Sequence, residues 1–204
     1  MENKSPQSTY HHGDLRNALI DAGLAILQEE GNEALTLRSV ARRANVSHAA
    51  PYRHFADKHE LLSAIATQGF EMLDKAMEAV IGDHPDDAKR RLIEIGVNYV
   101  RFGTEYPAHI ALMFSNLLSQ GQSEELSAAA SHTYESLVQA VEDAQAAGEI
   151  GPGDSNELAN SHWALVHGLT MLIKEGMLVH NQSARLSEVV RTAIGHLIDG
   201  TAAT

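Results

Sequence analysis

The sequence predicts an all-α protein, and three observations lead to this expectation. Apolar residues recur at helical spacing along most of the 204 residues. No segment of the sequence alternates with a sustained period of two, so strands have little support. Near the N-terminus, two helical segments of about two turns each are joined by three or four residues, which is the helix-turn-helix pattern. The length suits one large domain, or one domain that carries a small module.

Caps and breakers predict the N-terminal helices. The first helix has apolar residues at i, i+4, i+7 and i+11, and Gly31 ends it. Thr36 caps a short second helix, and Asn45, which tolerates the left-handed region, makes the tight turn that follows. Ser47 is expected to cap another short helix that ends near Phe55. The apolar residues of the first two helices are Leu15, Leu19, Ala22, Ile26, Leu37, Val40 and Ala41.

Capping signals also divide the rest of the chain. Asp57 and Glu60 form a capping-box pattern at the start of a long helix, which Gly82 and Pro85 are expected to break. The next helix is expected to hold two acidic residues in its first turn, where negative charge interacts favourably with the helix dipole. Those residues are Asp86 and Asp87. Later helices are predicted to start at Pro107, after the cap Ser123, and at the capping box of Asp154 and Glu157, and a last helix carries apolar residues from Leu186 onward.

The last two helices need a partner. The penultimate helix is apolar on most faces over residues 163–173, and the last one is amphipathic. An apolar helix must be buried, either inside the monomer or in a four-helix interface between two copies of the chain. The sequence does not decide between these two explanations.

Charge is distributed unevenly along the chain. The net charge is −12, yet residues 1–58 carry 7 basic and 7 acidic side chains, so the other 146 residues supply all of it. Residues 34–58 alone carry a net charge of +4. This basic segment is compatible with a nucleic-acid-binding head on an acidic body, and also with a solvated charged face.

Composition excludes several classes of protein and of functional site. Because there is no cysteine, disulfide frameworks, thiolate metal sites and cysteine nucleophiles are excluded. No apolar run reaches the roughly 20 residues of a membrane helix, and the N-terminus has no apolar signal segment. We therefore expect a soluble, cytoplasmic protein without membrane contact.

The helix-turn-helix makes a specific physical demand. Its second helix must fit a major groove about 12 Å wide and turn small or polar side chains toward the base edges. In this sequence, the residues at that position are Ser47, His48, Ala49 and Ala50.

These residues lie in a longer run with a family resemblance. The run comprises Leu35-Thr36-Leu37-Arg38-Ser39-Val40-Ala41, Ala44-Asn45-Val46-Ser47, Tyr52-Arg53-His54-Phe55, Asp57-Lys58 and Leu61-Leu62. Over about residues 12–65 it resembles the DNA-binding signature of TetR-type transcriptional regulators. The resemblance implies an N-terminal three-helix head, residues 1–56, on a C-terminal helical bundle for ligand binding and dimerisation, residues 57–204.

The same resemblance implies partners and roles. The protein is expected to be a ligand-responsive regulator, most simply a repressor, that binds double-stranded operator DNA and a small-molecule effector as a homodimer through its last two helices. Base-facing roles are implied for Ser47, His48 and Ala50. Phosphate contacts are implied for Thr36, Tyr52, His54 and Lys58; the Tyr52 ring can pack in the head at the same time.

Two departures from the family pattern affect the second short helix. Asn45 replaces the usual turn glycine. Pro51 removes the first backbone bond to the Ser47 carbonyl and disfavours α geometry at Ala50, so we expect this helix to begin irregularly.

A second resemblance concerns the penultimate helix. Trp163-Ala164-Leu165-Val166-His167-Gly168 looks like the element of the regulator branch whose C-terminal region is named WHG. Core packing is the ordinary role of Trp163, whereas His167 suits either the core or a pocket wall. Candidate ligand-binding residues, chosen as aromatic, Met or His positions on apolar faces, are Tyr99, Phe102, Met113, Phe114, His167 and Met171.

Two other functions remain possible from the sequence. One is a helical bundle that binds a metal or small molecule without DNA, and the other is an architectural DNA-binding factor without an effector. No histidine has an acidic residue three positions earlier, so no cofactor or metal is expected, although a site assembled across helices stays open. No enzyme motif is present, so we expect no catalysis. The histidines of that open site are His109, His132 and His167.

Overall fold

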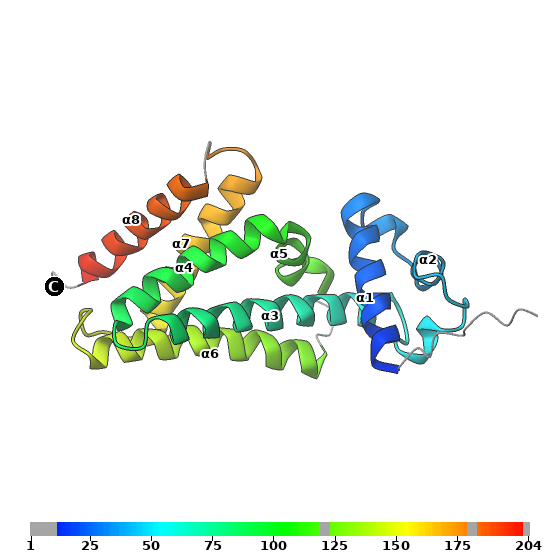
Figure 1. The fold of residues 1–204 in the computed structure, drawn as a ribbon, viewed down its shortest axis with the longest axis horizontal. Helices are drawn as coiled ribbons and strands as arrows, with labels where there is room; N and C mark the ends of the chain where they lie inside the picture. The colour runs from blue at the N-terminus through cyan, green and yellow to red at the C-terminus, as the bar shows by residue number, and fades with distance from the viewer. Residues whose placement is uncertain (1–11, 119–122, 179–182, 202–204) are drawn as a thin grey trace, which may run out of the picture.

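The computed structural model describes residues 12–118, 123–178 and 183–201 (Figure 1). Within these ranges the chain forms eight α-helices, three one-turn 3-10 helices and no strand, which confirms the all-α prediction. The α-helices are α1 (His12–Glu29), α2 (Leu37–Arg43), α3 (Lys58–Asp83), α4 (Ala88–Glu105), α5 (Pro107–Met113), α6 (Glu124–Ala146), α7 (Ser155–Lys174) and α8 (Ser183–Thr201). The 3-10 helices are η1 (Asn32–Ala34), η2 (Pro51–Arg53) and η3 (Asn116–Leu118).

The head consists of α1, α2 and η2 packed on the start of α3, and it lies at one end of the molecule (Figure 1). Gly31 follows α1 with φ 82°, a left-handed conformation that glycine adopts without strain, so its predicted role as a helix stop is confirmed. Thr36 caps α2 as predicted: its hydroxyl accepts from the Ser39 N–H at 3.0 Å. The largest fully buried side chains of the head and its junction with α3 are Leu19, Ile26, Leu35, Phe55, Leu61 and Ile65.

The turn after α2 has the predicted geometry. Asn45 has φ 54°, the only positive φ of a non-glycine residue in the described ranges. Its N–H donates to the Arg42 carbonyl, and the Val46 N–H donates to the Ala41 carbonyl. The helix therefore ends in a left-handed cap.

The second short helix differs from the prediction. Instead of an α-helix from Ser47 to Phe55, the chain makes a turn and then the single 3-10 turn η2. The irregular start expected from Pro51 is confirmed, because the Ser47 carbonyl accepts from the Ala50 N–H at 2.9 Å. The expectation that Ala50 avoids α geometry was wrong: its φ is −63° and its ψ is −45°.

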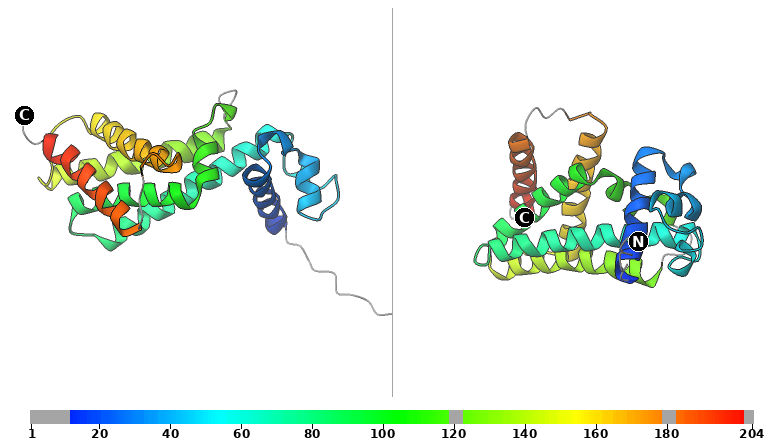
Figure 2. Two further views of the ribbon diagram at one scale, coloured as in Figure 1. Left: turned by 90° about the horizontal axis from the view of Figure 1, so that it is seen from above. Right: turned by 45° about the vertical axis from the view of Figure 1, so that its right-hand side comes forward.

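The body is built around α3 and α4. Helix α3 packs against α4, α5 and α6, and α4 packs against α6, α7 and α8. Figure 2 shows α3 running from the head along the length of the body. Helix α4 lies very close to its neighbours: a Cβ at Gly96 would collide with Ile194, and one at Gly103 with Thr170.

Most predicted helix ends in the body are confirmed, and two are corrected. The side chains of Asp57, Ser123 and Asp154 cap α3, α6 and α7. Gly82 does not break α3, which continues to Asp83. The acidic pair 86–87 precedes α4 instead of lying in its first turn, because Asp87 is the N-cap and accepts from the Arg90 N–H at 2.7 Å.

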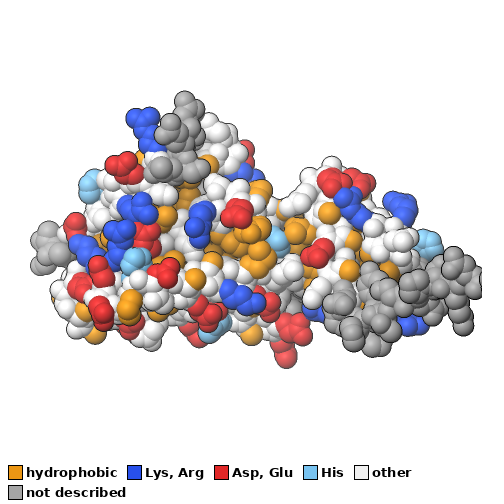
Figure 3. All heavy atoms as spheres, in the orientation of Figure 1, with side chains coloured by type: hydrophobic (Ala, Val, Ile, Leu, Met, Phe, Trp, Pro, Cys, Tyr) orange, Lys and Arg blue, Asp and Glu red, His pale blue; other side chains and the backbone are white. Residues whose placement is uncertain are grey.

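The head contacts the body through α3 and through smaller contacts beside it. Helix α1 touches α5, and Arg16 of α1 forms an ion pair with Glu125 of α6 at 3.7 Å. On the face shown in Figure 3, hydrophobic side chains gather where the body meets the head, and acidic side chains are scattered over the body. The side chains of Arg16 and Glu125 are both exposed, so their ion pair contributes little to stability.

The last two helices are only partly covered within one chain. Trp163 and Leu172 of α7 are 36% and 41% exposed, and Val189 of α8 is 39% exposed. A Cβ built at Gly168 would meet nothing within 4 Å. Burial inside the monomer therefore does not account for the apolar character of α7. Among the described residues, no helix is both long and apolar enough to cross a membrane.

Candidate nucleic-acid interface and internal cavity

The predicted DNA-contacting residues gather on the outer surface of the head. Ser47 and His48 are exposed in the turn before η2, and Tyr52 of η2 is 54% exposed. His54 and Lys58, at the end of η2 and the start of α3, are half-buried. An exposed tyrosine on so short an element is unusual for a packing residue, and its position suits a contact outside the chain.

Ala50 is the exception among these residues. It is only 9% exposed, so its methyl group faces the interior of the head. The predicted base-facing role of Ala50 is therefore not supported, because the turn imposed by Pro51 directs this residue inward. His48 and Ser47, one turn earlier, remain available.

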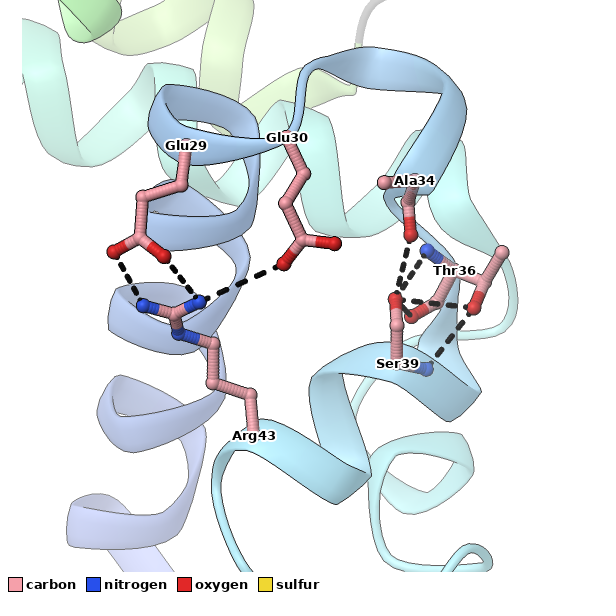
Figure 4. Close-up of polar contacts among 6 residues, drawn as sticks. All are labelled: Glu29, Glu30, Ala34, Thr36, Ser39 and Arg43. Atoms are coloured by element: carbon pink, nitrogen blue, oxygen red, sulfur yellow. Dashed lines mark hydrogen bonds and ion pairs between the residues drawn. The ribbon is translucent and has the colours of Figure 1, made fainter.

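Two of the residues predicted to contact phosphate, Thr36 and Lys58, also form hydrogen bonds within the head. The Thr36 hydroxyl is exposed and belongs to a capping box in which the Thr36 N–H donates to Ser39 Oγ at 2.9 Å (Figure 4). The Lys58 ammonium donates to the Asn32 carbonyl, which ties the start of α3 to η1. Since an ammonium has three N–H donors, this bond leaves donors for an anion.

The basic residues of the head fall into two groups. Arg43 forms a forked hydrogen bond with Glu29 and a longer ion pair with Glu30 at 3.7 Å, so its charge is neutralised locally (Figure 4). The same bond lowers the pKa of Glu29. Three further arginines of the head, Arg38, Arg42 and Arg53, are exposed and have no ion-pair partner in the part of the chain that the structure describes.

A cavity of about 160 Å³ lies in the body between α3, α4, α6 and α7. Of the predicted ligand-binding residues, Tyr99 and Phe114 line it, whereas Phe102, Met113, His167 and Met171 do not. No Lys, Arg, Asp or Glu is among the lining residues. Most of the lining residues could not be predicted from the sequence, because they have the same apolar spacing as the residues of the core. The full lining is Phe70, Leu73, Met77, Ile95, Tyr99, Phe114, Ala130, Thr133, Tyr134, Leu137, His162, Trp163 and Val166.

His167 stands directly behind the cavity wall. Its Nδ1 lies 2.8 Å from the hydroxyl oxygen of Tyr99, and its ring lies 4.7 Å from the Phe114 ring, centroid to centroid. Burial raises the pKa of Tyr99 to about 12, opposed by a hydrogen bond with Trp163. Burial lowers the pKa of His167. The polar groups of this cluster thus satisfy one another and stay uncharged at neutral pH.

His162 is the most deeply buried titratable group at the cavity. It is 1% exposed, and its Nε2 lies 3.1 Å from the Leu92 carbonyl of α4. Burial lowers the pKa of His162 to about 4, so the ring is neutral at pH 7. A carbonyl can only accept, so Nε2 carries the proton and Nδ1 carries a lone pair. That Nδ1 is buried and has no hydrogen-bond partner.

The three histidines of the open metal hypothesis have other contacts. His109 Nε2 lies 3.4 Å from Gln68, and His132 Nε2 lies 3.2 Å from Asp74. His167 contacts Tyr99. Within the described ranges, no three or more His, Asp or Glu side chains are grouped so that they could hold a metal ion.

The head and body together define a helix-turn-helix transcriptional regulator. The chain belongs to the TetR family: residues 19–65 match the model for bacterial regulatory proteins of the tetR family, and residues 92–197 match the tetracyclin repressor-like C-terminal domain. It is therefore a regulator and not an enzyme, as its sequence predicts.

Known proteins resemble the chain over different lengths. A protein of unknown function from Rhodococcus sp. RHA1 has 36% identity and a TM-score of 0.85, over 96% of this chain and 100% of its own. The TetR family regulator PfmR from Thermus thermophilus shares the fold, with 19% identity and a TM-score of 0.69 over 90% of this chain and 95% of its own.

Curated relatives match mainly in the head. The nicotine-responsive repressor HdnoR of Paenarthrobacter nicotinovorans is 33% identical over 36% of this chain. The repressor KstR of Rhodococcus jostii is 39% identical over 34% of this chain. The chain spans 38% and 33% of the lengths of these two relatives.

Proposed function

We propose that this regulator represses transcription as a homodimer on double-stranded operator DNA, and that a small molecule in the body changes its affinity for DNA. The observation that carries this proposal is the surface of the head. There, Ser47, His48 and Tyr52 are exposed beside arginines that have no partner in the described ranges. Exposed cations hold phosphates, and short polar side chains on such a turn reach base edges.

Dimerisation through α7 and α8 is the second part of the proposal. The exposed apolar residues Leu172 and Val189 and the open space at Gly168 support it, since a glycine on an apolar face lets another helix approach closely. A two-fold dimer presents two heads, and the half-sites that they read lie ~34–36 Å apart on B-DNA.

The proposed coupling runs along α3. With a head of residues 1–56 and a body of residues 57–204, α3 begins at the junction, and Lys58 binds the head through the Asn32 carbonyl. An effector in the cavity touches α3 at Phe70, Leu73 and Met77 and tilts it, which changes the separation of the two heads. Linkage requires that DNA weakens effector binding by the same factor.

We assign the chain to the WHG branch of the family, and three residues support this. Trp163 lines the cavity, His167 holds the hydroxyl of a lining tyrosine, and Gly168 lies on the open face of α7. One short element thus serves both the cavity and the proposed interface. We further propose that the protein acts in the cytoplasm, where operator DNA lies, and needs no cofactor other than the effector.

A gel shift with the DNA upstream of the protein's own gene tests DNA binding. At two salt concentrations, affinity should fall with a log–log slope of about 0.9 for each neutralised phosphate. Lys58→Ala should weaken binding to all sequences alike, whereas His48→Ala should change the preferred bases. A slope near zero would contradict the proposal, and so would a monomer in sedimentation at the working concentration.

A further inference from the structure

The cavity of the body reaches the surface at a rim that is mostly aromatic. Most of its lining residues are buried, but Phe114, Ala130 and Tyr134 are half-buried and Trp163 is 36% exposed. The Trp163 ring lies 5.7 Å from the Phe114 ring and 6.4 Å from the Tyr134 ring, centroid to centroid. The opening therefore lies where the end of α5 meets α6 and α7, and a ligand that enters there can extend beyond the enclosed volume.

The hydroxyl groups of the cavity wall already have partners. The Thr133 hydroxyl donates to a carbonyl of its own helix at 3.0 Å, and the Tyr134 hydroxyl donates to Asn160 at 3.1 Å. The Tyr99 hydroxyl oxygen lies 2.8 Å from Nδ1 of His167. A ligand therefore gains little from hydrogen bonds to these groups, since each new bond would replace an existing one.

The described lining residues carry no charge. None of them is Lys, Arg, Asp or Glu. His162 is neutral at pH 7, because burial lowers its pKa to about 4, and its unpaired Nδ1 is itself buried and not presented to a ligand. Helix α6 carries acidic residues and no Lys or Arg, and the one basic residue of α7, Lys174, lies about three turns after Trp163. An anion therefore finds no partner in the wall and no cation beside the opening on these helices.

A cation is also disfavoured in the cavity. An ammonium group over a buried aromatic face gains up to about 30-fold in affinity. The loss of its hydration shell costs far more than this when no carboxylate is present to pair with it. An uncharged ligand has no such cost, and it gains from the apolar area that it buries and from contacts with the aromatic rings.

We propose that the cavity binds an uncharged, lipophilic molecule, which it holds by apolar and aromatic contacts and admits between Phe114, Tyr134 and Trp163. The wall selects by charge: it disfavours carboxylates and ammonium ions and accepts uncharged molecules of varied shape. This inference deepens the proposed function and rests on it only in treating the cavity as the effector site.

The test compares three probes that share one rigid hydrocarbon cage and differ in charge. They are 1-adamantanol, which is uncharged, 1-adamantanecarboxylate, an anion at pH 7, and 1-adamantylammonium, a cation. Each is titrated into the full-length protein, and binding is read from the fluorescence of Trp163, the one tryptophan of the chain, and from the rise in melting temperature. We expect the alcohol to bind at least tenfold more tightly than either ion.

A variant at the opening assigns the binding to this cavity. Ala130→Leu places a larger side chain in the lining and should weaken the binding of 1-adamantanol about tenfold, because it occupies part of the apolar space. Ala128→Leu is the matched control: it introduces the same side chain into the same helix, but Ala128 is exposed and lies outside this lining. The control should keep the wild-type affinity.

Several results would overturn the inference. These are binding of the carboxylate or the ammonium ion as tight as that of the alcohol or tighter, no binding of any of the probes, or an unchanged affinity in Ala130→Leu. The wild-type series alone decides the first two if the variant does not fold. A gel shift with and without 1-adamantanol separates the two proposals: a probe that binds without affecting DNA contradicts the effector role and leaves the inference standing.

Discussion

The hydroxyl oxygen of Tyr99 lies 2.8 Å from Nδ1 of His167, and this contact joins α4 to α7 beside the cavity. Helices α4 and α7 both pack against α8, and both contribute residues to the cavity lining. The contact therefore lies between the proposed effector site and the proposed dimer interface. Its removal provides the first prediction.

Tyr99→Phe should lower the free energy of unfolding by about 1 to 2 kcal/mol, because His167 Nδ1 loses its partner in a partly buried site. The matched control is Tyr134→Phe, whose hydroxyl bonds to Asn160 at a more exposed position. We expect the control to change the unfolding free energy by less than about 0.5 kcal/mol. Urea denaturation of both variants measures the difference, and equal losses would contradict the prediction.

Gly96→Ala should destabilise the protein by about 1 to 3 kcal/mol, because the added methyl collides with Ile194. Ile194→Ala in the same chain should recover part of this loss, which a double-mutant cycle detects. Gly82→Ala serves as the control, since its Cβ meets nothing within 4 Å in α3. The control should be neutral or slightly stabilising, as alanine favours helices.

Acid should destabilise the protein through His162. Burial lowers the pKa of this ring to about 4, below the usual value of about 6.5, so the unfolded chain binds the proton more readily. The contribution is fully present above pH ~6.5 and is lost as the pH falls through ~4, for a total of about 3 kcal/mol. His109 and His167 are shifted in the same direction.

The pH profile is therefore compared between the wild type and His162→Gln. Denaturation at several pH values between ~4 and ~7 should show a shallower decline in the variant. Parallel profiles would show that His162 does not titrate in this range.

Arg42→Gln should reduce the salt dependence of DNA binding more than Arg43→Gln does. Arg42 is exposed with no ion-pair partner in the described ranges, whereas Arg43 is already paired with Glu29. Loss of one phosphate contact per protomer lowers the log–log slope by about 0.9 for that protomer. Gel shifts over a salt series measure both variants, and the opposite ranking would refute the division of the arginines.

Local features of the fold could be predicted from the sequence, because their causes lie within a few residues. The side chains of Thr36, Asp57 and Asp154 cap amides two or three positions away. The positive φ of Asn45 follows from the tolerance of asparagine itself for the left-handed region. The effect of Pro51 was predicted as an irregular start, but its full extent, a 3-10 turn in place of a helix, depends on how the head packs.

The rest depends on contacts between residues distant in the sequence. Arg43 meets Glu29 only after α2 folds back on α1, so a count of charges along the chain overstates the free positive charge of the head. The cavity requires four helices to come together, and its lining residues have the same apolar spacing as the core. His162 is the clearest case, since only the Leu92 carbonyl of α4 shows which nitrogen is free.

Helix α3 is a single rod of 26 residues, about 39 Å long, and the cavity lies partway along it. For a straight rod that pivots at Asp83, Leu73 is about 15 Å from the fulcrum and Lys58 about 38 Å. A push of about 1 Å at the cavity then becomes about 2.5 Å at the head, as with any lever of these arm lengths. An unbroken α3 thus magnifies small displacements, and a proline inserted midway would absorb them.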